Sequence, residues 1–414
     1  MLVLALTCDR SSARFQLRQI PDDDGDDDGP KVLAAGEIGS EDGRPGLDGS
    51  ADGTRAMGQI SRRVHEALGE AALDAVGHKV VHGGERFTAP TVVTQDVIEA
   101  LERSTRLAPE HNHSALQGIR ISRDLWPGIP QVAVFDSAFH RTLPEVAWRY
   151  PIPDGFHRRQ GIRRYGFHGI SVEFAARIAA GFLGMRIERF DGIVAHLDHE
   201  SSVTALKRGR SIDTSMGLTP ADGLVMDTSC GDLDPSVLLH LQRRGLEDGS
   251  LEELLNRHSG FQALCGLDDL GFIQEVAANG GREARLALEI AAYRLAKYIG
   301  GYHVAVGGAQ ALVFTGHYGQ DVPGFRALVV NRLAALGVVL DGTSNRATSR
   351  EPRLISAPAS AFPVLVVPAD QERAVAETTA GFLRRSKAGL PAVNPTAWSP
   401  AGGARPATAV PRRR

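Results

Sequence analysis

The chain has 414 residues, a formal net charge of −3 and a hydrophobic content of 43%. This length suffices for two domains with substantial cores, whereas the near-neutral charge excludes a basic nucleic-acid surface, and no apolar run approaches the roughly 20 residues of a membrane-spanning helix. Three widely spaced cysteines without a C-x-x-C pair indicate neither a disulfide framework nor a zinc site, and no signal-peptide pattern opens the chain, so we expect a cytoplasmic protein without nucleic-acid or membrane partners.

The N-terminal segment predicts a hairpin followed by polar loops and a helix. Apolar residues 2–6 and 15–17 indicate two strands joined by a polar turn. The acidic stretch 21–30 and the Gly/Asp/Ser-rich stretch 39–54 lack the regular ligand spacing of a calcium loop, so solvated loops are favoured. Residues 55–75 have the apolar spacing of an amphipathic helix.

Two predicted strands end in polar residues that could carry chemistry. Residues 78–85 read as a strand that contains Lys79 and enters a glycine turn. Residues 131–135 read as a buried strand that delivers Asp136 at its carboxyl end, where open α/β sheets place ligands. An aspartate there can also cap a helix, but the neighbouring Phe139 and His140 favour the functional interpretation. For His82, beside paired glycines, a packed structural role is favoured over catalysis.

The stretch from Ile193 to Pro235 predicts a strand, a hairpin and a long irregular loop. Residues 193–197 and 202–206 are the strands, and 207–210 are the turn. Residues 213–235 are rich in Gly, Thr, Ser, Asp and Pro, and their length favours a functional loop over an ordinary connection.

The C-terminal half alternates helices and strands, as an α/β protein requires. Helices are predicted over most of 235–256, over 282–301 with an end at Gly300-Gly301, and from about 372 to 384. Strands are predicted at 311–314 and 364–367. After the first of these comes a glycine turn in which Tyr318 could stack on a base or fill a wall. The Pro/Ala/Gly/Arg segment 387–414 is predicted to be disordered.

Several motifs resemble those of the acetate kinase family, in family order from about Leu2 to about Arg384. They are D-T-S-M-G-L-T-P at 213–220, V-V-H-G-G-E at 80–85, V-F-D-S-A-F-H at 134–140 and R-R-Y-G-F-H-G at 163–169. The resemblance implies the duplicated actin-like kinase fold, with two α/β domains around a central cleft. These would be residues 1–142, completed by a helix at about 372–386, and residues 143–371, through which family members form homodimers.

The resemblance also implies a reaction and its residues. The reaction is reversible phosphoryl transfer between ATP and acetate, or another short carboxylic acid, with Mg²⁺. Asp136 and His168 would be catalytic, the first supporting the substrate carboxylate and its cation, the second donating to the phosphoryl group. Lys79 and Val81 would contact the substrate, and no side chain is assigned to a metal. Nucleotide contacts would come from Arg14, His196, Ser201, Asp269, Gly316 and Gly319.

Other positions depart from the family's pattern. Asp198 and Glu200 stand where the family has glycines in a phosphate-cradling turn, and an acid there repels a polyanion. Ser229 replaces an arginine that stabilises the phosphoryl transition state, Lys79 replaces a second arginine, and Gln371 replaces a metal-linked glutamate. We therefore expect impaired transfer. The alternative is a non-catalytic homologue that acts as a dimeric binding or regulatory module, and a kinase with another phosphoryl donor such as pyrophosphate has no positive signal.

Overall fold

The computed structural model describes residues 1–9, 12–21, 29–39, 51–104 and 109–389. Most of the predicted acidic loop and of the predicted C-terminal tail lies outside the described residues. Within them the chain forms two six-stranded sheets. The first contains β1 (Leu2–Cys8), β2 (Ser12–Gln19), β3 (Lys31–Gly39), β4 (Ala75–Val80), β5 (Thr91–Val92) and β6 (Gln131–Phe135), and the second contains β7 (Gly192–His196), β8 (Ser202–Lys207), β9 (Arg210–Thr214), β10 (Ala311–Thr315), β11 (Arg353–Leu354) and β12 (Val364–Val366).

The two sheets repeat one topology. In the first, β1, β2 and β3 form an antiparallel meander, and β4 and β6 continue the sheet parallel to β1. In the second, β7, β8 and β9 form the meander, and β10 and β12 run parallel to β7. The central strands are buried along almost their whole length, as apolar strands covered on both faces should be. The prediction of two mixed sheets in a duplicated α/β architecture is therefore confirmed.

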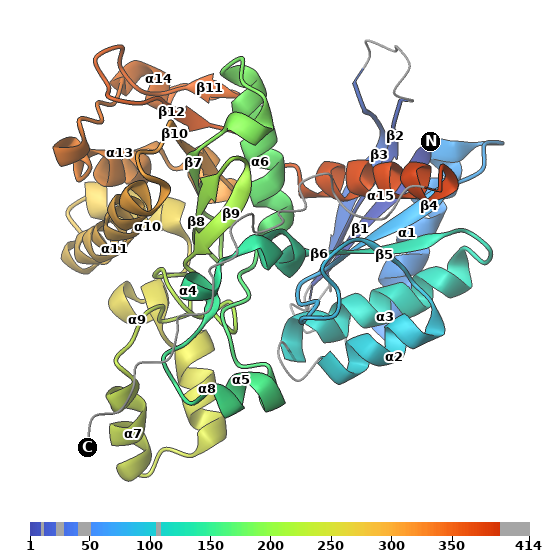
Figure 1. Cartoon of the computed structure of the whole chain (residues 1–414), viewed down its shortest axis with the longest axis horizontal. Coiled ribbons are helices and arrows are strands. Elements are labelled where there is room, and N and C mark those ends of the chain that lie inside the picture. Colours follow the sequence, from blue (N-terminus) through green and yellow to red (C-terminus); the bar gives the residue numbers. More distant parts are fainter. Residues whose placement is uncertain (10–11, 22–28, 40–50, 105–108, 390–414) are drawn as a thin grey trace, which may run out of the picture.

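Helices cover both faces of each sheet (Figure 1). On the first sheet, α1 (Ala51–Leu68) and α3 (Pro109–Leu125) pack on one face, and α15 (Gln371–Lys387) returns from the far end of the chain to pack on the other. We call this sheet with α1, α2 (Gln95–Ser104), α3 and α15 the first lobe.

The remaining described elements form the second lobe. On its sheet, α6 (Gly169–Phe182) covers one face, and α10 (Leu270–Ala278), α11 (Arg282–Val306) and α13 (Pro323–Asn331) cover the other. The shorter helices are α4 (Glu145–Trp148), α5 (Asp154–Gln160), α7 (Pro235–Arg243), α8 (Asp248–Arg257), α9 (Gly260–Cys265), α12 (His317–Asp321) and α14 (Gly342–Arg346), with 3-10 turns η2 (Asp136–Thr142) joining the lobes, η3 (Ile187–Arg189) and η4 (Ala334–Leu336). The division at residue 142 stays a prediction.

Some predicted boundaries were wrong. Helix α1 ends at Leu68 rather than at 75, because Gly69 adopts a left-handed conformation with φ +57°. Helix α11 passes through Gly300-Gly301 to Val306 and ends at Gly307, since glycines in a 25-residue helix cost only about 1 kcal/mol each. Strand β3 was not anticipated, and both arms of the first hairpin are longer than predicted.

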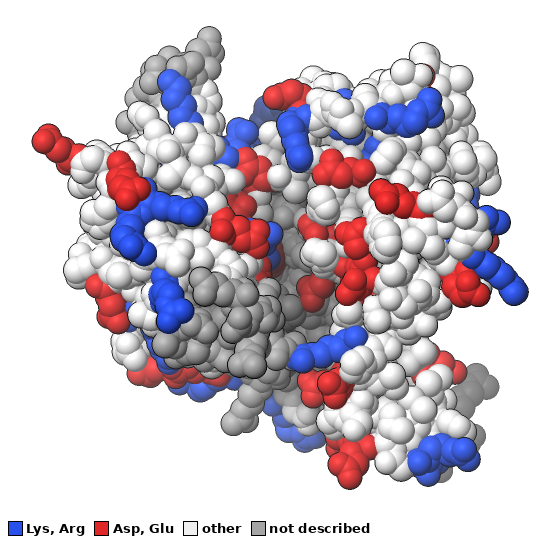
Figure 2. Space-filling view, turned by 180° about the vertical axis from the view of Figure 1, so that it is seen from behind, with Lys and Arg blue, Asp and Glu red and all other residues white. Residues whose placement is uncertain are grey.

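The surface is hollowed between the lobes. Seen from the side opposite to that of Figure 1, acidic side chains gather around this hollow (Figure 2). None of the helices in the described ranges is long and apolar enough to cross a membrane.

Candidate active site

Sheet register brings Lys79 and Asp136 together in the first lobe. Strands β4 and β6 are parallel, with Lys79 opposite Val134 and Val80 opposite Phe135, so both strands end at the same edge. The Lys79 Nζ lies 3.3 Å from Asp136 Oδ2, and Asp136 is only 1% exposed. Burial alone would lower the pKa of Lys79, but Asp136 and Asp9 raise it above its ordinary value. A charged ammonium therefore lies beside a buried carboxylate.

Two imidazoles from the second lobe belong to the same region. His168 adopts φ 60° immediately before α6, and its Nδ1 lies 3.0 Å from Ser202 Oγ. The ring of His168 lies 4.4 Å from that of His196 at the end of β7. Burial lowers the pKa of His196, although Asp198 and Asp136 oppose this shift. The Nδ1 of His196 is buried and has no hydrogen-bond partner among the described residues, which suits a site for a polar ligand.

The N-terminus of α6 is fitted against Asp136. The Ile170 N–H donates to Asp136 Oδ1 over 3.3 Å. A Cβ at Gly169 would overlap the backbone carbonyl of Asp136, so glycine permits the close approach. The carboxylate is thus oriented by Lys79 on one oxygen and by backbone on the other.

An apolar cluster lies next to this polar group. Val81 from the first lobe packs with Tyr165, Phe167, Met216 and Met226 from the second. An ammonium beside an apolar wall matches a carboxylate that carries a short alkyl group, because each end then meets its preferred environment. A contact between Val81 and the substrate stays a prediction.

Arg164 was missed by sequence reasoning, although it lies within the R-R-Y-G-F-H-G motif. Its Nη1 donates to the carbonyl oxygens of Thr214, Ser215 and Met216 over 2.8–2.9 Å. Three carbonyls converging on one guanidinium fix the start of the long loop. The position of Met216 in the apolar cluster depends on this contact.

The predicted nucleotide contacts are largely bonded within the chain. Arg14 donates to Asp9 over 3.2 Å, and its Nε lies 3.6 Å from Glu372. Ser201 Oγ donates to the Asp198 carbonyl over 2.8 Å. Asp269 Oδ1 caps α10 by accepting the N–H of Phe272 over 2.6 Å. Arg14 lies in β2, Ser201 immediately precedes β8 and Asp269 immediately precedes α10, and their polar atoms already serve the fold.

The glycine turn after β10 also makes its contacts within the chain, with the backbone of Leu197. Gly316 adopts φ +82°, and a Cβ there would overlap the carbonyl oxygen of Leu197. The N–H groups of Tyr318 and Gly319 both donate to that same oxygen, over 3.0 and 3.2 Å. Both glycines therefore serve the packing of this turn against β7.

Asp198 binds backbone N–H groups with its side chain. Its Oδ1 accepts from His199 N over 3.0 Å, and its Oδ2 accepts from His317 N over 3.3 Å. Burial alone would raise the pKa of Asp198, but the His196 ring and the N–H groups of His317 and His199 lower it. The ionised carboxylate of Asp198 therefore accepts one N–H group from the loop after β7 and one from the turn after β10.

A second network joins two loops and α12 of the second lobe. His199 Nδ1 lies 2.5 Å from Asp227 Oδ2, and the Tyr318 hydroxyl donates to that oxygen over 2.8 Å. The hydrogen bond to Asp227 raises the pKa of His199 to about 9, although partial burial opposes the shift. Burial raises the pKa of Asp227, whereas His199 and Tyr318 lower it. Tyr318 is 1% exposed, so it fills the wall and presents no face to a base.

This network should make stability depend on pH. Because the pKa of His199 is raised from 6.5 to about 9, its contribution is complete below pH 6.5 and is lost as the pH rises through about 9. We expect His199→Asn to flatten the fall in urea midpoint between these pH values. The effect should be about 1 kcal/mol or less, because the His199 side chain is 74% exposed and water screens the pair.

The control for that experiment is His258→Asn, which changes an exposed histidine of the same lobe. It should leave the pH slope unchanged. An unchanged slope in His199→Asn would show that the contact with Asp227 does not stabilise the fold.

The residues at the predicted metal-linked position do not fit a direct Mg²⁺ ligand. Gln371 is neutral, and its Nε2 donates to Ser171 Oγ over 3.2 Å. The adjacent carboxylate, Glu372, faces Arg14. Mg²⁺ prefers carboxylate and phosphate oxygens, so neither side chain offers a ready ligand. The described residues also contain no group of three or more His, Cys, Asp or Glu that could hold a metal ion.

Comparisons with known proteins identify the family to which the chain belongs. The Acetokinase family matches residues 31–377. An acetate kinase from Pseudarthrobacter chlorophenolicus is 51% identical over 386 residues, covering 92% of this chain and 98% of its own. The crystal structure of Porphyromonas gingivalis acetate kinase superposes with a TM-score of 0.81 at 35% identity, covering 92% of this chain and 99% of that one. A propionate kinase from Francisella tularensis gives 0.80 at 32% identity, with coverage of 91% and 98%.

These similarities extend over nearly the whole chain, and they confirm the predicted actin-like kinase fold as well as the resemblance seen in the motifs. The chain is therefore a member of the acetokinase family.

Proposed function

We propose that this protein transfers phosphate reversibly between ATP and acetate, or another short carboxylic acid, at a rate far below that of a family member with arginine at position 229. The observation that carries the proposal is the contrast between two halves of the site. On one side, the Lys79–Asp136 pair and His168 offer a cation and a hydrogen-bond donor to a carboxylic acid and its phosphoryl group. On the nucleotide side, the Asp198 carboxylate accepts a backbone N–H group.

On the acid side, each residue has a chemical task. The Lys79 ammonium attracts the substrate carboxylate, and Asp136 holds that ammonium in place. Val81 and its cluster accept the alkyl group. His168 donates a hydrogen bond to the phosphoryl group, whose transition state spreads negative charge over three equatorial oxygens. ATP supplies that group, and Mg²⁺ would neutralise its charge when bound.

On the nucleotide side, charge opposes binding. At about 4 Å and an effective dielectric of about 20, an acid repels a phosphate oxygen by about 4 kcal/mol before screening by salt. Asp198 and Glu200 are both only partly exposed, so screening is incomplete. At the arginine position, Ser229 Oγ donates to the Asn256 carbonyl over 3.3 Å and has no charge to offer.

A specific observation favours a second candidate, a non-catalytic homologue that binds a short acid and signals its presence. His199 and Asp227 hydrogen-bond with each other and with Tyr318. A network of this kind stabilises the loops without any nucleotide.

Calorimetry with Mg-ATP, paired with a hydroxylamine trap for acetyl phosphate, tests the proposal. We expect the wild-type protein to bind Mg-ATP at least tenfold more weakly than the Asp198→Gly, Glu200→Gly double variant, because the variant removes two like-charge contacts. Slow trapping of acetyl phosphate by the wild-type protein supports an impaired kinase. Binding of acetate without any product supports the second candidate.

The matched control is Glu252→Gln, Glu253→Gln, which removes two acids from the exposed face of α8 and changes the net charge equally. It should not change Mg-ATP affinity. Equal affinity in the wild-type protein and the Asp198→Gly, Glu200→Gly variant would contradict the electrostatic account.

We further propose that the protein is a cytoplasmic homodimer. Large apolar side chains on α10 and α11 are half exposed in the single chain: Phe272, Leu286 and Tyr293 are 51%, 53% and 56% exposed. An exposed apolar group of this kind suits a partner surface. Light scattering after gel filtration measures the mass directly.

A further inference from the structure

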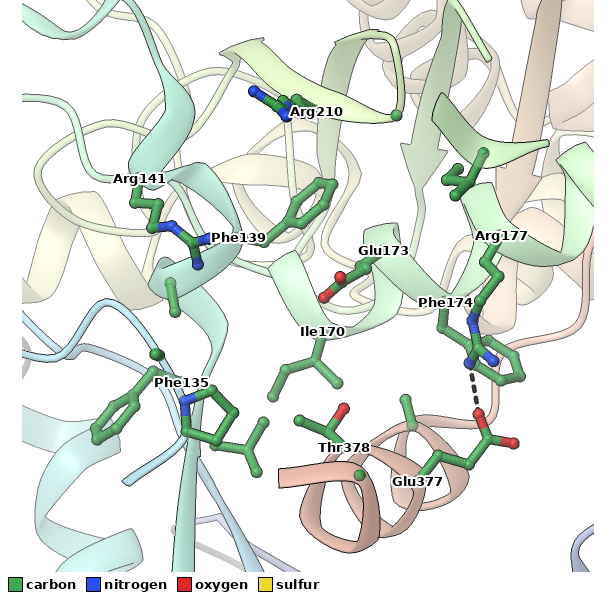
Figure 3. A pocket seen from close by; sticks show the side chains of 18 of the residues that line it. Phe135, Phe139, Arg141, Ile170, Glu173, Phe174, Arg177, Arg210, Glu377 and Thr378 are labelled. Carbon is green, nitrogen blue, oxygen red and sulfur yellow. Dashed lines mark hydrogen bonds and ion pairs between the residues drawn. The ribbon is translucent and has the colours of Figure 1, made fainter. Parts of the chain in front are cut away.

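A cavity lies between the lobes, next to the candidate active site. It has a volume of about 350 Å³ and is bounded by η2, α6, α15 and the β8–β9 turn (Figure 3). None of the residues that line it is a predicted site residue. Its volume is within the range of small-molecule sites, roughly 300–1,000 Å³.

Arginine donors in this cavity are incompletely used. Arg141 Nη1 donates to the Thr88 carbonyl over 2.9 Å, which leaves other N–H groups of its fork. The Arg210 side chain makes no hydrogen bond or ion pair within the described ranges. The Nε of Arg385 is buried, and no described residue accepts its hydrogen. A buried guanidinium donor without an acceptor is unfavourable, so the cavity favours an anionic ligand.

The acids of the cavity do not cancel these charges. Glu377 accepts from Arg177 over 2.5 Å and from Arg373 over 2.7 Å. Glu188 lies 3.4 Å from the exposed Arg186. The remaining acid of the cavity, Glu173, also has an interaction partner. The carboxylates are therefore already partnered, whereas Arg141, Arg210 and Arg385 keep donors to offer.

Apolar side chains form the rest of the wall. Phe139 and Ile170 lie between Arg141 and the Arg177–Glu377 pair (Figure 3), and Phe174 completes this surface. Ile170 and Phe174 are 6% and 5% exposed. A simple inorganic ion would leave this apolar surface in contact with water, whereas an anion with an apolar body would cover it.

We propose that this cavity binds a small organic anion, with its carboxylate or phosphate group held by Arg141 and Arg210 and its apolar body against Phe139 and Ile170. A planar guanidinium fork binds either anionic group with two parallel hydrogen bonds. The proposal stands whether or not the protein transfers phosphate.

A ligand here would contact the wall of the active site. Phe135 lines the cavity and immediately precedes Asp136. Ile170 lines it too, and its N–H donates to Asp136 Oδ1. The ligand would also bridge α15 of the first lobe and α6 of the second. It is therefore placed to act as a regulator that holds the two lobes in one relative position.

Phenyl phosphate is the probe, measured by calorimetry and by the thermal unfolding of the full chain. We expect saturable binding with a Kd below ~1 mM and a rise in melting temperature with probe concentration. Inorganic phosphate and benzyl alcohol, which each carry half of the required chemistry, should bind at least tenfold more weakly. The Arg141→Ala, Arg210→Ala double variant should lose at least tenfold in affinity for the probe, because two charged donors are removed.

A second variant and a control locate the site. Thr378→Trp places a large ring in the cavity from α15 and should block the probe while leaving both arginines (Figure 3). Arg243→Ala, Arg244→Ala removes two exposed charges at the end of α7 and should change nothing. Absence of saturable binding by the wild-type protein would overturn the proposal, as would undiminished binding in both cavity variants.

Discussion

The Ser229→Arg, Lys79→Arg double variant is expected to form acetyl phosphate at least 100-fold faster than the wild-type protein. Arginines that stabilise a transferring phosphoryl group contribute about 10³ to 10⁵ in rate. We expect less than that full range because Asp198 and Glu200 would still oppose the phosphates. At position 79 the planar fork replaces a point charge beside Asp136, which adds bidentate geometry without adding charge. The hydroxylamine trap measures the product directly.

The local structure suggests two companions for that variant. Ser229 is 9% exposed and lies two residues after Asp227, whose carboxylate could capture a new guanidinium. Adding Asp227→Gly should therefore raise the rate further. Ser229→Lys with Lys79→Arg supplies the same charge without the fork and should recover less. A wild-type rate equal to that of the arginine variant would refute the impaired site.

Lys79→Met is expected to destabilise the protein by about 3–5 kcal/mol, because it leaves a buried carboxylate without its cation. The two groups are well shielded from water, with the Lys79 side chain 12% and the Asp136 side chain 1% exposed. The Ile170 N–H would remain on the other oxygen, but one backbone donor cannot replace a full charge. Urea denaturation with matched slopes measures the loss.

A double-mutant cycle separates charge from packing. Lys79→Met with Asp136→Asn should recover most of the lost stability, because no uncompensated charge then remains buried. Arg158→Met breaks an ion pair with Asp154 in which the arginine is 78% exposed, and it should have little effect. If the double variant is as unstable as Lys79→Met alone, the lysine stem and not its charge stabilises this region.

These two experiments address one property of the site. Its cations are matched by acids of the same chain: Lys79 faces Asp136, and Arg14 faces Asp9 and Glu372. The Asp198 carboxylate in turn takes the N–H of His317. A polyanionic ligand must displace these internal partners, and that displacement reduces its affinity even where the donors themselves survive.

Much of the framework could be predicted from the sequence, because its signals are local. Continuous apolar runs indicated β6, β7 and β10, and the residue after β6 was recognised as a candidate for chemistry. The motif order was sufficient to identify the family. Where local signals failed, a single conformation decided the outcome, as at Gly69, which ends α1, and at Gly300-Gly301, which does not end α11.

The sequence by itself determined many of the elements, the family and the departures from the family's pattern. Only the tertiary structure decided what those departures do. His199, Asp227 and Tyr318 are separated by 28 and 91 residues, yet they share one carboxylate oxygen. The cavity between the lobes likewise joins η2, α6, the β8–β9 turn and α15. Periodicity and propensity report only on neighbours along the chain, whereas such contacts arise from sheet register and helix packing that bring distant loops together.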